Sequence, residues 1–391
     1  MVEWVKWESN DFKSHTQLQG GGPPWLTNHM GDACCQVRAV TNNLCAGDSG
    51  GMEDYMIKIE RCKENPIVTP GVYDWRKATA FNPGVLFDNN KFYMYERAAG
   101  SLRPFQTRIG LLESDDGIHF TPVTDKPVFT GDMLGIPTAS IEDARVIKID
   151  GTVYMCYAMQ PYQFDCWPTG TGLPDYYTDN YPDWSQNHVA PMMTRSGIAV
   201  SEDGICFKQL CYTTPPEIDD RDNTLFPEKI NGKFAMLRRP MQFVGRDYGT
   251  DIPGIWISYS DDLMEWSQPA LVAVAENFEW EGTKIGAAAT PLRTEKGWLV
   301  LYHGVDANSV YRVGAMLLDL KNPKKVIART KAPIMEPEAY YEKHGLVIPN
   351  VIFPTANIIK DGLLYIYYGC CDTCIGLATV PVDEFLDSIT G

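Results

Sequence analysis

The sequence predicts an all-β protein, a five-bladed β-propeller with an irregular N-terminal extension. Five times along the 391-residue chain, a short turn led by Gly or Asn precedes an alternating apolar run. Such a turn supplies the positive backbone angles of a tight hairpin, and the run after it is typical of a returning strand. From Asn90, the turns at Gly151, Gly232, Gly297 and Gly362 follow at intervals of 61, 81, 65 and 65 residues. This radial repetition predicts five blades.

Residues 1–70 are expected to form the extension, and residues 71–391 the propeller, which we expect to be the catalytic domain. The extension is rich in Gly, Pro, Asn and Cys, with little periodicity. Its run Cys-Ala-Gly-Asp-Ser-Gly-Gly, which contains Ser49, resembles the nucleophile segment of chymotrypsin-type proteases. Only 48 residues precede this serine, and neither histidine of the extension has the sequence context of a catalytic base. A glycine-rich loop is the favoured interpretation.

The eleven cysteines are interpreted as reduced thiols of a cytoplasmic protein, because the N-terminus lacks the basic-then-apolar order of a signal peptide. Cys371 and Cys374 have the spacing of a redox or zinc motif, but a lone CxxC after an apolar strand favours buried thiols. Four more lie in the extension: Cys34, Cys35, Cys45 and Cys62. The nearby histidines complete no familiar ligand spacing, so no metal site is expected.

Within the blades, three turn motifs follow the hairpins. They begin at Ser114, Ser201 and Ser260, and each places an Asp two residues later and an aromatic residue shortly after it. The pattern is typical of Asx-type turns that join outer strands, so we expect these carboxylates to be structural.

An aromatic-rich insertion interrupts the regular spacing at about residues 160–194. It contains Tyr162, Phe164, Trp167, Tyr176, Tyr177, Tyr181 and Trp184. A loop dense in aromatic side chains on a propeller rim suits stacking against sugar rings. Packing of the same side chains on the blade or on a neighbouring subunit explains the composition equally well.

Polar residues interrupt the apolar strand just before each hairpin. Asn82 and Asp143 each precede their turn by eight residues, which places them at the same level of adjacent inner strands, facing the axis. The cations expected near them are Arg221, Arg238, Arg239, Lys284 and His303. Several cations and one acid at a single axis predict an anion bound beside an acid. Pairing of each cation with a blade carboxylate is the alternative, common for any one of them but less so for all.

Charge and composition limit the kinds of partner. A net charge of −16 and a pI near 4.8 argue against binding to nucleic acid or to an anionic membrane. No apolar run approaches the length that spans a membrane. With 44% hydrophobic residues, a chain of this length can bury a large core without a cofactor.

Short motifs recur in order through the last third of the chain. They are Lys284-Ile285-Gly286, residues 294–299, Tyr302-His303-Gly304, residues 311–314, residues 317–320, Pro333-Ile334, Tyr341-Glu342, residues 350–354 and Tyr367-Tyr368-Gly369 with Asp372. In order and spacing the set resembles glycoside hydrolase family 130, and the resemblance covers about residues 72–386. It implies a five-bladed propeller that acts on β-mannosides. Most members are inverting phosphorylases that release α-mannose 1-phosphate, and a minority are hydrolases.

The resemblance also implies roles for individual residues. Asp143, in Ile-Glu-Asp-Ala-Arg, matches the proton donor, which acts through the 3-hydroxyl of the bound mannose; the family usually has proline in place of Ala144. The residues that match the phosphate-binding set are Arg221, Arg239, Lys284, His303 and Tyr311. Those that resemble mannose-binding residues are Asn82, Asp372 and either Arg97 or Arg103.

This set fits inverting phosphorolysis, because bound phosphate is already a nucleophile and needs orientation by cations, not a general base. Hydrolytic relatives carry glutamates at basic positions, whereas this chain keeps its cations. We therefore expect a β-mannoside phosphorylase with inorganic phosphate as co-substrate and no cofactor. A hydrolase on the same scaffold and a non-catalytic sugar-binding propeller are the alternatives. The sequence leaves open the linkage (β-1,2 or β-1,4) and the acceptor, and we expect a homo-oligomer because relatives often are.

Overall fold

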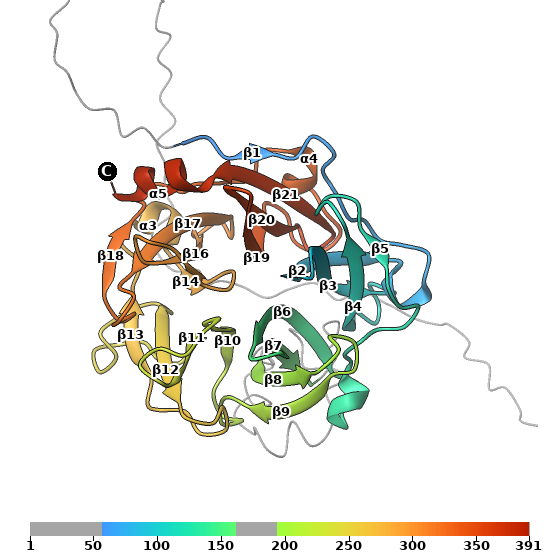
Figure 1. Ribbon diagram of the computed structural model, residues 1–391, viewed down its shortest axis with the longest axis horizontal. Coiled ribbons are helices and arrows are strands. Elements are labelled where there is room, and N and C mark those ends of the chain that lie inside the picture. Colours follow the sequence, from blue (N-terminus) through green and yellow to red (C-terminus); the bar gives the residue numbers. More distant parts are fainter. Residues whose placement is uncertain (1–56, 162–193, 391) are drawn as a thin grey trace, which may run out of the picture. The chain divides into compact units, whose positions relative to one another are not determined.

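Five antiparallel sheets surround a central axis, which confirms the five-bladed β-propeller (Figure 1). The structure, a computed structural model, describes residues 57–161 and 194–390. The first three blades are β2 (Thr79–Asp88), β3 (Lys91–Ala99), β4 (Thr107–Ser114) and β5 (Thr121–Pro122); β6 (Ser140–Ile149), β7 (Thr152–Gln160), β8 (Arg195–Ser201) and β9 (Lys208–Tyr212); and β10 (Asp220–Leu225), β11 (Phe234–Pro240), β12 (Ile255–Ser260) and β13 (Ala270–Ala273). In each of them the strands pair in chain order, starting from the axis.

The last two blades depart from this plan at their inner and outer edges. Their strands are β14 (Lys284–Ala287), β15 (Leu292–Arg293), β16 (Trp298–Val305), β17 (Tyr311–Leu318) and β18 (Val326–Arg329), then β19 (Ile352–Lys360), β20 (Leu363–Cys370) and β21 (Cys374–Pro381). Blade 4 has an interrupted inner strand, because β14 and β15 both pair with β16. In blade 5 the outer strand is β1 (Glu60–Arg61), which precedes the first blade in the chain and pairs with β21.

The predicted hairpin turns join the inner strands to their neighbours. Four of them place both central residues at positive φ, as in the pairs Asp150–Gly151 and Asp361–Gly362, where φ lies between 49° and 86°. Asn, Asp and Gly tolerate this conformation, which matches the twist of the flanking strands. The fourth turn differs: only Gly297 has positive φ, at 149°.

Both ends of the described chain close the ring at blade 5. Asn65 donates its side-chain N–H to the Leu377 carbonyl (2.8 Å) and accepts the Leu377 N–H (2.9 Å), so it extends the edge of β21 as a strand would. Residues 57–68, part of the expected N-terminal extension, thus contact the propeller. The C-terminal helix α5 (Val382–Thr390) buries Phe385 and Leu386 in the core beside blades 4 and 5.

The Asx-type turns form as expected and help to join neighbouring blades. Asp203 accepts the backbone N–H groups of Ile205 and Cys206 at 2.8 and 2.7 Å, and Asp116 and Asp262 make equivalent pairs. Tyr95 of blade 1 donates its hydroxyl to the carbonyl of Gly204 in the blade 2 turn, at 3.0 Å. The carboxylates therefore stabilise turns where neighbouring blades meet, far from the axis.

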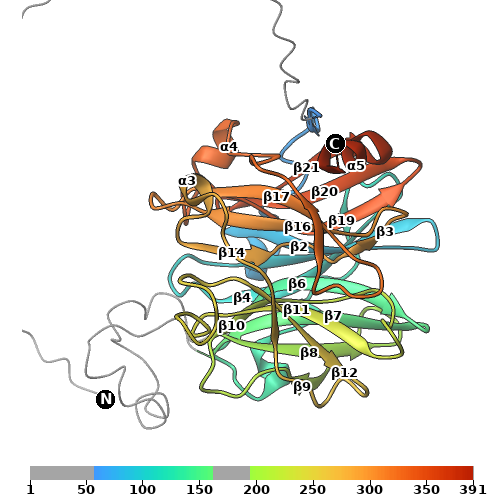
Figure 2. The ribbon, with the colours of Figure 1, turned by 90° about the vertical axis from the view of Figure 1, so that its left-hand side faces the viewer.

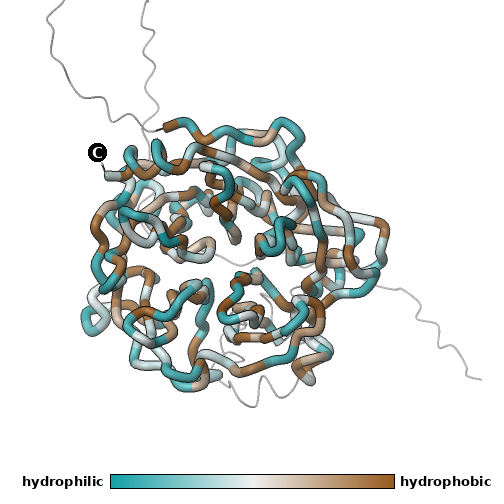
Figure 3. Tube along the Cα trace, viewed as in Figure 1, coloured by the Kyte–Doolittle hydropathy of each residue, from teal (hydrophilic) through white to brown (hydrophobic). Residues whose placement is uncertain are grey.

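Hydrophobic stretches run along the blades, and hydrophilic residues gather in many of the outer turns (Figure 3). Seen from the side, the short helices α3 (Phe278–Glu281) and α4 (Tyr340–Lys343) lie toward the same face of the ring (Figure 2). Two short 3-10 helices, Asp74–Arg76 and Gly131–Leu134, precede β2 and β6. In the described part of the chain, no helix is long and apolar enough to cross a membrane.

Several sequence-based expectations fall outside the described residues. These are the segment around Ser49, the cysteines Cys34, Cys35 and Cys45, and the insertion from residue 162 to residue 193. Cys370, Cys371 and Cys374 are buried thiols, as interpreted, and the Cys371 Sγ donates to the Glu342 carbonyl at 2.9 Å.

Candidate functional site

The inner strands of blades 1, 2 and 3 share one irregularity, a β-bulge with a left-handed residue. The pairing shifts between Phe81 and Gly84, between Glu142 and Arg145, and between Arg221 and Thr224. The first unpaired residue within each shift has positive φ: 41° at Asn82, 51° at Asp143 and 55° at Asp222. A bulge re-aims side chains, and Asn and Asp are the non-glycine residues that best tolerate this conformation.

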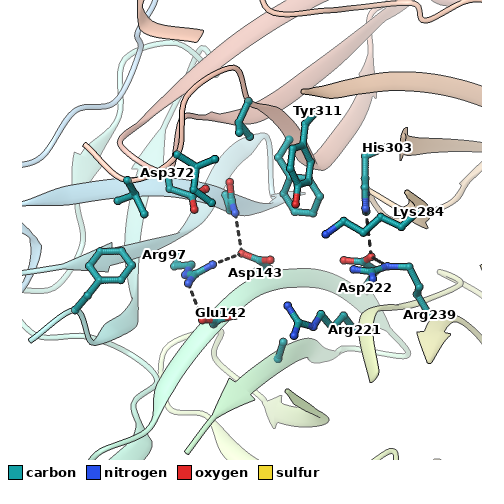
Figure 4. Close-up of a pocket in the computed structure, with 17 residues that line it drawn as sticks. Arg97, Glu142, Asp143, Arg221, Asp222, Arg239, Lys284, His303, Tyr311 and Asp372 are labelled. Carbon is teal, nitrogen blue, oxygen red and sulfur yellow. Dashed lines mark hydrogen bonds and ion pairs between the residues drawn. The ribbon is translucent and has the colours of Figure 1, made fainter. Parts of the chain in front are cut away.

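These bulges point their side chains into one pocket on the axis (Figure 4). Every blade contributes to it. The described residues that line it are Asn82, Arg97, Phe105, Glu142, Asp143, Ala158, Arg221, Asp222, Arg239, Lys284, His303, Tyr311, Val347, Ile348, Val351, Phe353 and Asp372. The pocket thus brings together the residues predicted for the site except Arg103 and Arg238. Arg103 is exposed and lies outside the lining, whereas Arg97 is part of it; the role of Arg97 in mannose binding stays a prediction.

One of the two carboxylate oxygens of Asp143 accepts no hydrogen bond from the described residues and is available to the pocket. Its Oδ1 accepts hydrogen bonds from Asn82 Nδ2 (2.9 Å) and Arg97 Nη1 (3.0 Å). Arg145 Nη1 lies 4.0 Å from Oδ2, too far for a hydrogen bond. Since two donors occupy Oδ1, Oδ2 is the oxygen that can carry a proton and donate it. The contact between Asn82 and Asp143 confirms that they lie at the same level of adjacent inner strands.

Three carboxyl groups gather around the buried guanidinium of Arg97. Its Nη2 donates to Glu142 Oε1 at 2.7 Å, and its plane lies over the Phe81 ring at 4.6 Å. Burial raises the pKa of Glu142 to about 7, with Arg97 opposing and Asp143 adding to the rise. Burial likewise raises the pKa of Asp372 to about 6, again against Arg97. Glu142 and Asp372 therefore bind protons at higher pH than exposed carboxyl groups do.

Sequence reasoning missed Glu142 as a pocket residue, although it adjoins Asp143 in the chain. Neighbouring residues of a regular strand point to opposite faces, so a carboxylate next to an inward Asp is expected to point away. The bulge breaks this alternation and brings both side chains to the pocket. The signal that could have revealed it is the run of two acidic residues inside an otherwise apolar inner strand.

Cationic side chains from blades 3 and 4 form the other side of the pocket (Figure 4). Arg239 Nε donates to Asp222 Oδ2 at 2.5 Å, and Arg221 is held by Asp219 at 2.8 and 2.9 Å. Lys284 differs: its ammonium lies 5.2 Å over the Tyr311 ring, and no carboxylate of the described residues forms an ion pair with it. Pairing with blade carboxylates therefore explains the two arginines but not the lysine.

His303 is a neutral group within this cationic side. Burial lowers its pKa to about 3, and the neighbouring cations Arg239 and Lys284 add to the effect while Asp222 opposes it. Its Nε2 lies 3.6 Å from Asp222 Oδ2. Asp222 itself stays ionised, because Arg239 and Arg145 together outweigh its burial and lower its pKa. At neutral pH the imidazole can donate one hydrogen bond without adding charge.

Arg238 does not belong to this cationic side, so the expectation that it faces the axis is wrong. Its guanidinium pairs with the buried Asp220, through Nε at 2.9 Å and Nη2 at 2.5 Å. Arg238 and Arg239 are successive residues of β11, and successive strand residues point to opposite faces. Only Arg239 can therefore reach the pocket.

Two glycines allow the side chains of the pocket to approach the backbone closely. A Cβ at Gly286 would lie 2.2 Å from Asp222 Oδ2 and 2.7 Å from Arg239 Nε. A Cβ at Gly369 would lie 1.8 Å from Asn82 Oδ1. Neither distance is compatible with a side chain unless the site moves, so both positions need glycine.

An apolar wall lines the rest of the pocket. Phe105 stacks on Phe81 at 6.3 Å between ring centres, and Val347 packs against both. Val347 and Ile348 belong to the segment between α4 and β19. This segment is held on the turn that carries Asp372, since the Leu346 N–H donates to Thr373 Oγ1 at 2.7 Å. An acid, a cationic cluster and an apolar wall thus meet in one pocket.

This arrangement suits a displacement reaction on a neutral, partly apolar substrate. An anion held by the cations can attack one face of a carbon while an acid protonates the leaving group on the other. Among the described residues, no group of three or more His, Cys, Asp or Glu side chains has the geometry of a metal site. The roles of the individual residues remain predictions.

The chain matches the sequence model of one protein family over most of its length. The family is described as β-1,4-mannooligosaccharide phosphorylase, glycoside hydrolase family 130, and the match covers residues 57–167 and 177–390.

Curated relatives and a solved structure agree with this match. The chain is 35% identical to a 1,2-β-oligomannan phosphorylase and 35% identical to a β-1,2-mannobiose phosphorylase, both of Thermoanaerobacter sp. (strain X514). Each alignment covers 84% of this chain and 99% of the relative. Among solved structures, the β-1,2-mannobiose phosphorylase of Listeria innocua in complex with β-1,2-mannobiose superposes with a TM-score of 0.67 at 25% identity. That alignment covers 85% of this chain and 99% of the other.

Proposed function

Because the chain belongs to glycoside hydrolase family 130 and is an enzyme of its β-mannoside phosphorylase group, we propose that it phosphorolyses β-1,2-linked mannooligosaccharides with inversion. The products are α-mannose 1-phosphate and a mannooligosaccharide shortened by one residue. Inorganic phosphate is the co-substrate, and the reaction uses no other cofactor.

One observation carries the proposal: an acid with one available oxygen shares a pocket with a cation that has no carboxylate partner among the described residues. Asp143 is held through Oδ1 and offers Oδ2, whereas Lys284 lies on the cationic side with its charge unneutralised. Phosphate would provide the missing counter-charge. Arg221, Arg239 and neutral His303 would then supply directed N–H donors to its oxygens.

In the proposed reaction, an oxygen of the bound phosphate attacks C1 of the terminal mannose as the glycosidic C1–O bond breaks. The departing oxygen takes a proton that originates on Asp143 Oδ2, relayed through the 3-hydroxyl of the mannose. Phosphate needs no general base, because it is already ionised at neutral pH. Attack from the face opposite the leaving group inverts the anomeric configuration. Asn82 and Arg97 keep the Asp143 carboxylate oriented throughout.

The apolar wall is the proposed contact for the leaving sugar. Phe105, Val347 and Ile348 line the pocket without polar side-chain atoms. The C–H face of a pyranose packs favourably on such a surface, whereas its hydroxyl groups need polar partners. The mannosyl unit that reacts belongs between Asp143 and Asp372, where polar groups are concentrated.

The β-1,2 linkage is proposed because of the relatives that align over nearly their whole length. Two of them are named for β-1,2-linked substrates, and each aligns over 99% of its own length. The family description names β-1,4-linked oligosaccharides instead, so the two linkages must be compared directly.

The test is a product assay with β-1,2-mannobiose and β-1,4-mannobiose, each with and without inorganic phosphate. We expect α-mannose 1-phosphate from the β-1,2 substrate, only when phosphate is present. Asp143→Asn should reduce turnover by about 10²–10⁴-fold, the typical contribution of a positioned general acid. Release of free mannose at a rate that ignores phosphate would identify a hydrolase and contradict the proposal. Preference for the β-1,4 substrate would contradict the linkage alone.

A further inference from the structure

Arg145 lies on the propeller axis and contacts four of the five blades. It follows the bulge in β6, its side chain is 2% exposed, and it is not among the described residues that line the pocket. Its Nε donates to the Ala288 carbonyl of blade 4 at 3.0 Å, and its guanidinium centre lies 5.6 Å from the Phe353 ring of blade 5. The guanidinium therefore occupies the axis next to the pocket without entering it.

One branch of this guanidinium reaches the cationic side. Arg145 Nη2 donates to Asp222 Oδ1 at 3.3 Å. The other oxygen of the same carboxylate, Oδ2, accepts from Arg239 Nε at 2.5 Å and lies 3.6 Å from His303 Nε2. Since Arg145 occupies Oδ1, the carboxylate plane is set and Oδ2 is directed to the two pocket residues.

The other branch reaches the acid. Arg145 Nη1 donates to the backbone carbonyl of Asp143 at 2.8 Å. This carbonyl belongs to the left-handed residue of the bulge, whose φ is 51°. A fixed donor on this carbonyl favours the peptide orientation that the bulge needs, and a non-glycine residue in this conformation depends on such support from its surroundings.

From these contacts we infer that Arg145 is a positioning residue for the phosphate site, acting through Asp222 on Arg239 and His303. The inference rests on the proposed function, in which Arg239 and His303 hold phosphate. Arg145 touches neither phosphate nor sugar. It sets the direction of Asp222, and Asp222 sets the direction of the donors that face the anion. Through Nη1, which donates to the Asp143 carbonyl, the same guanidinium also holds the anion site and the acid in a fixed arrangement.

The alternative is that Arg145 only stabilises the fold. Another buried arginine of the chain provides a matched control for this alternative. Arg329 is also buried, with a side chain 6% exposed, and is tied to Tyr302 (3.0 Å), Glu281 (2.7 Å) and the Val274 carbonyl (2.7 Å). It does not line the pocket or contact a described residue that does. A Lys in its place loses the same forked hydrogen bonding, but its partners Tyr302 and Glu281 do not line the pocket.

The experiment measures phosphate binding by titration calorimetry, and the separate KM values for phosphate and β-1,2-mannobiose, in Arg145→Lys and Arg329→Lys. Lys keeps the charge but cannot serve three acceptors on different blades. We expect Arg145→Lys to weaken phosphate binding about 10-fold, the effect of losing one charge-assisted hydrogen bond. The KM for mannobiose should change less than about 3-fold, and Arg329→Lys should leave phosphate binding unchanged. Equal effects of the two variants on phosphate would overturn the inference.

Asp222→Asn supplies a second route that keeps Arg145 and so does not depend on the folding of Arg145→Lys. The single change should also weaken phosphate binding, because Asn offers one acceptor oxygen where two are used. In the Asp222→Asn background, Arg145→Lys should add less than about 2-fold, since coupled residues give non-additive changes. Additive effects, or phosphate binding that Asp222→Asn leaves intact, would overturn the inference.

Arg239→Ala separates this inference from the proposed function. If it leaves phosphate binding unchanged, the assignment of the phosphate site itself is wrong. If it weakens binding while Arg145→Lys does not, only the role of Arg145 is wrong.

Discussion

The three bulges share one backbone conformation, but their side chains make different contacts and have different roles. Asn82 donates to the carboxylate of the next blade, Asp143 offers a free oxygen to the pocket, and Asp222 anchors two basic residues. The differences arise from the partners that each blade supplies. Arg97 stands beside Asp143, whereas Arg145 and Arg239 surround Asp222 and lower its pKa. The chemistry of each bulge is therefore set by neighbouring blades.

Glu142 makes the stability of the protein depend on pH near neutrality. Burial raises its pKa from 4.5 to about 7, so between these values the folded state binds its proton more tightly than the unfolded chain does. This contribution to stability is greatest below about pH 4.5 and declines as the pH rises to about 7. We expect the free energy of unfolding of the wild type, relative to Glu142→Gln, to fall between pH 5 and pH 8 in urea denaturation.

Asp203→Asn is the control, because folding lowers the pKa of Asp203 whereas it raises that of Glu142. The backbone N–H groups of Cys206 and Ile205 lower the pKa of Asp203, so the stability it contributes is lost only as the pH falls below its ordinary range. Asp203→Asn should therefore lower the free energy of unfolding by the same amount throughout pH 5–8 and leave its pH dependence in that interval unchanged. Parallel curves for the wild type and Glu142→Gln over that interval would show that Glu142 does not bind its proton more tightly in the folded state.

At the scale of elements, blades 4 and 5 repeat one buried network that explains how the ring closes. In blade 4, Glu281 of α3 accepts from the Tyr302 hydroxyl (2.8 Å) and from Arg329 of the outer strand β18 (2.7 Å). In blade 5, Glu342 of α4 accepts from the Tyr368 hydroxyl (2.9 Å) and from Arg61 of β1 (2.8 Å). Strand β1 thus takes the place of β18, and Arg61 takes the place of Arg329.

Arg61→Ala tests this closure. It would leave the fully buried Glu342 carboxylate without its cation, and breaking a buried pair in this way costs about 3 kcal/mol. We expect a loss of this size in the free energy of unfolding by urea denaturation. Lys58→Ala, which removes the exposed pair with Glu60, should cost less than about 1 kcal/mol. Similar small losses in both variants would mean that β1 does not secure the last blade.

At the scale of the whole molecule, the pocket requires all five blades in register. Blades 1 and 2 carry the acid side, blades 3 and 4 the cationic side, and blade 5 supplies Asp372 and Phe353. A ligand that contacts several blades at once stabilises the closed ring relative to any state in which one blade has separated. Binding and stability are therefore linked through the central pocket.

Phosphate should accordingly raise the melting temperature. A ligand at 100 times its Kd adds about 2.7 kcal/mol to the stability of the folded state. We expect a phosphate-dependent shift in a thermal melt of the wild type, and a much smaller shift in Lys284→Ala, because Lys284 is the cation of the pocket without an ion pair among the described residues. Lys233→Ala, an exposed lysine paired with Asp261, is the control and should keep the full shift. An equal shift in Lys284→Ala would remove Lys284 from the phosphate site.

Short-range patterns along the chain are enough to predict the repeat, the hairpins and the level of Asp143 on its strand. Turn residues and alternating apolar runs act over a few neighbours, so Asp150–Gly151 and its counterparts predict blades without tertiary information. Equal spacing from those turns placed Asn82 and Asp143 together, and they form a hydrogen bond. Up to this point local rules are sufficient.

Tertiary structure alone decided which polar residues share the pocket and how the ring is closed. Glu142 and Asp222 enter because bulges break strand alternation, Arg238 leaves because alternation holds in β11, and Arg103 stays exposed. Residues from distant parts of the chain, such as Arg61 with Glu342, meet only when the blades assemble. The physical reason is that side-chain direction depends on strand register and long-range pairing, which nearby residues do not specify.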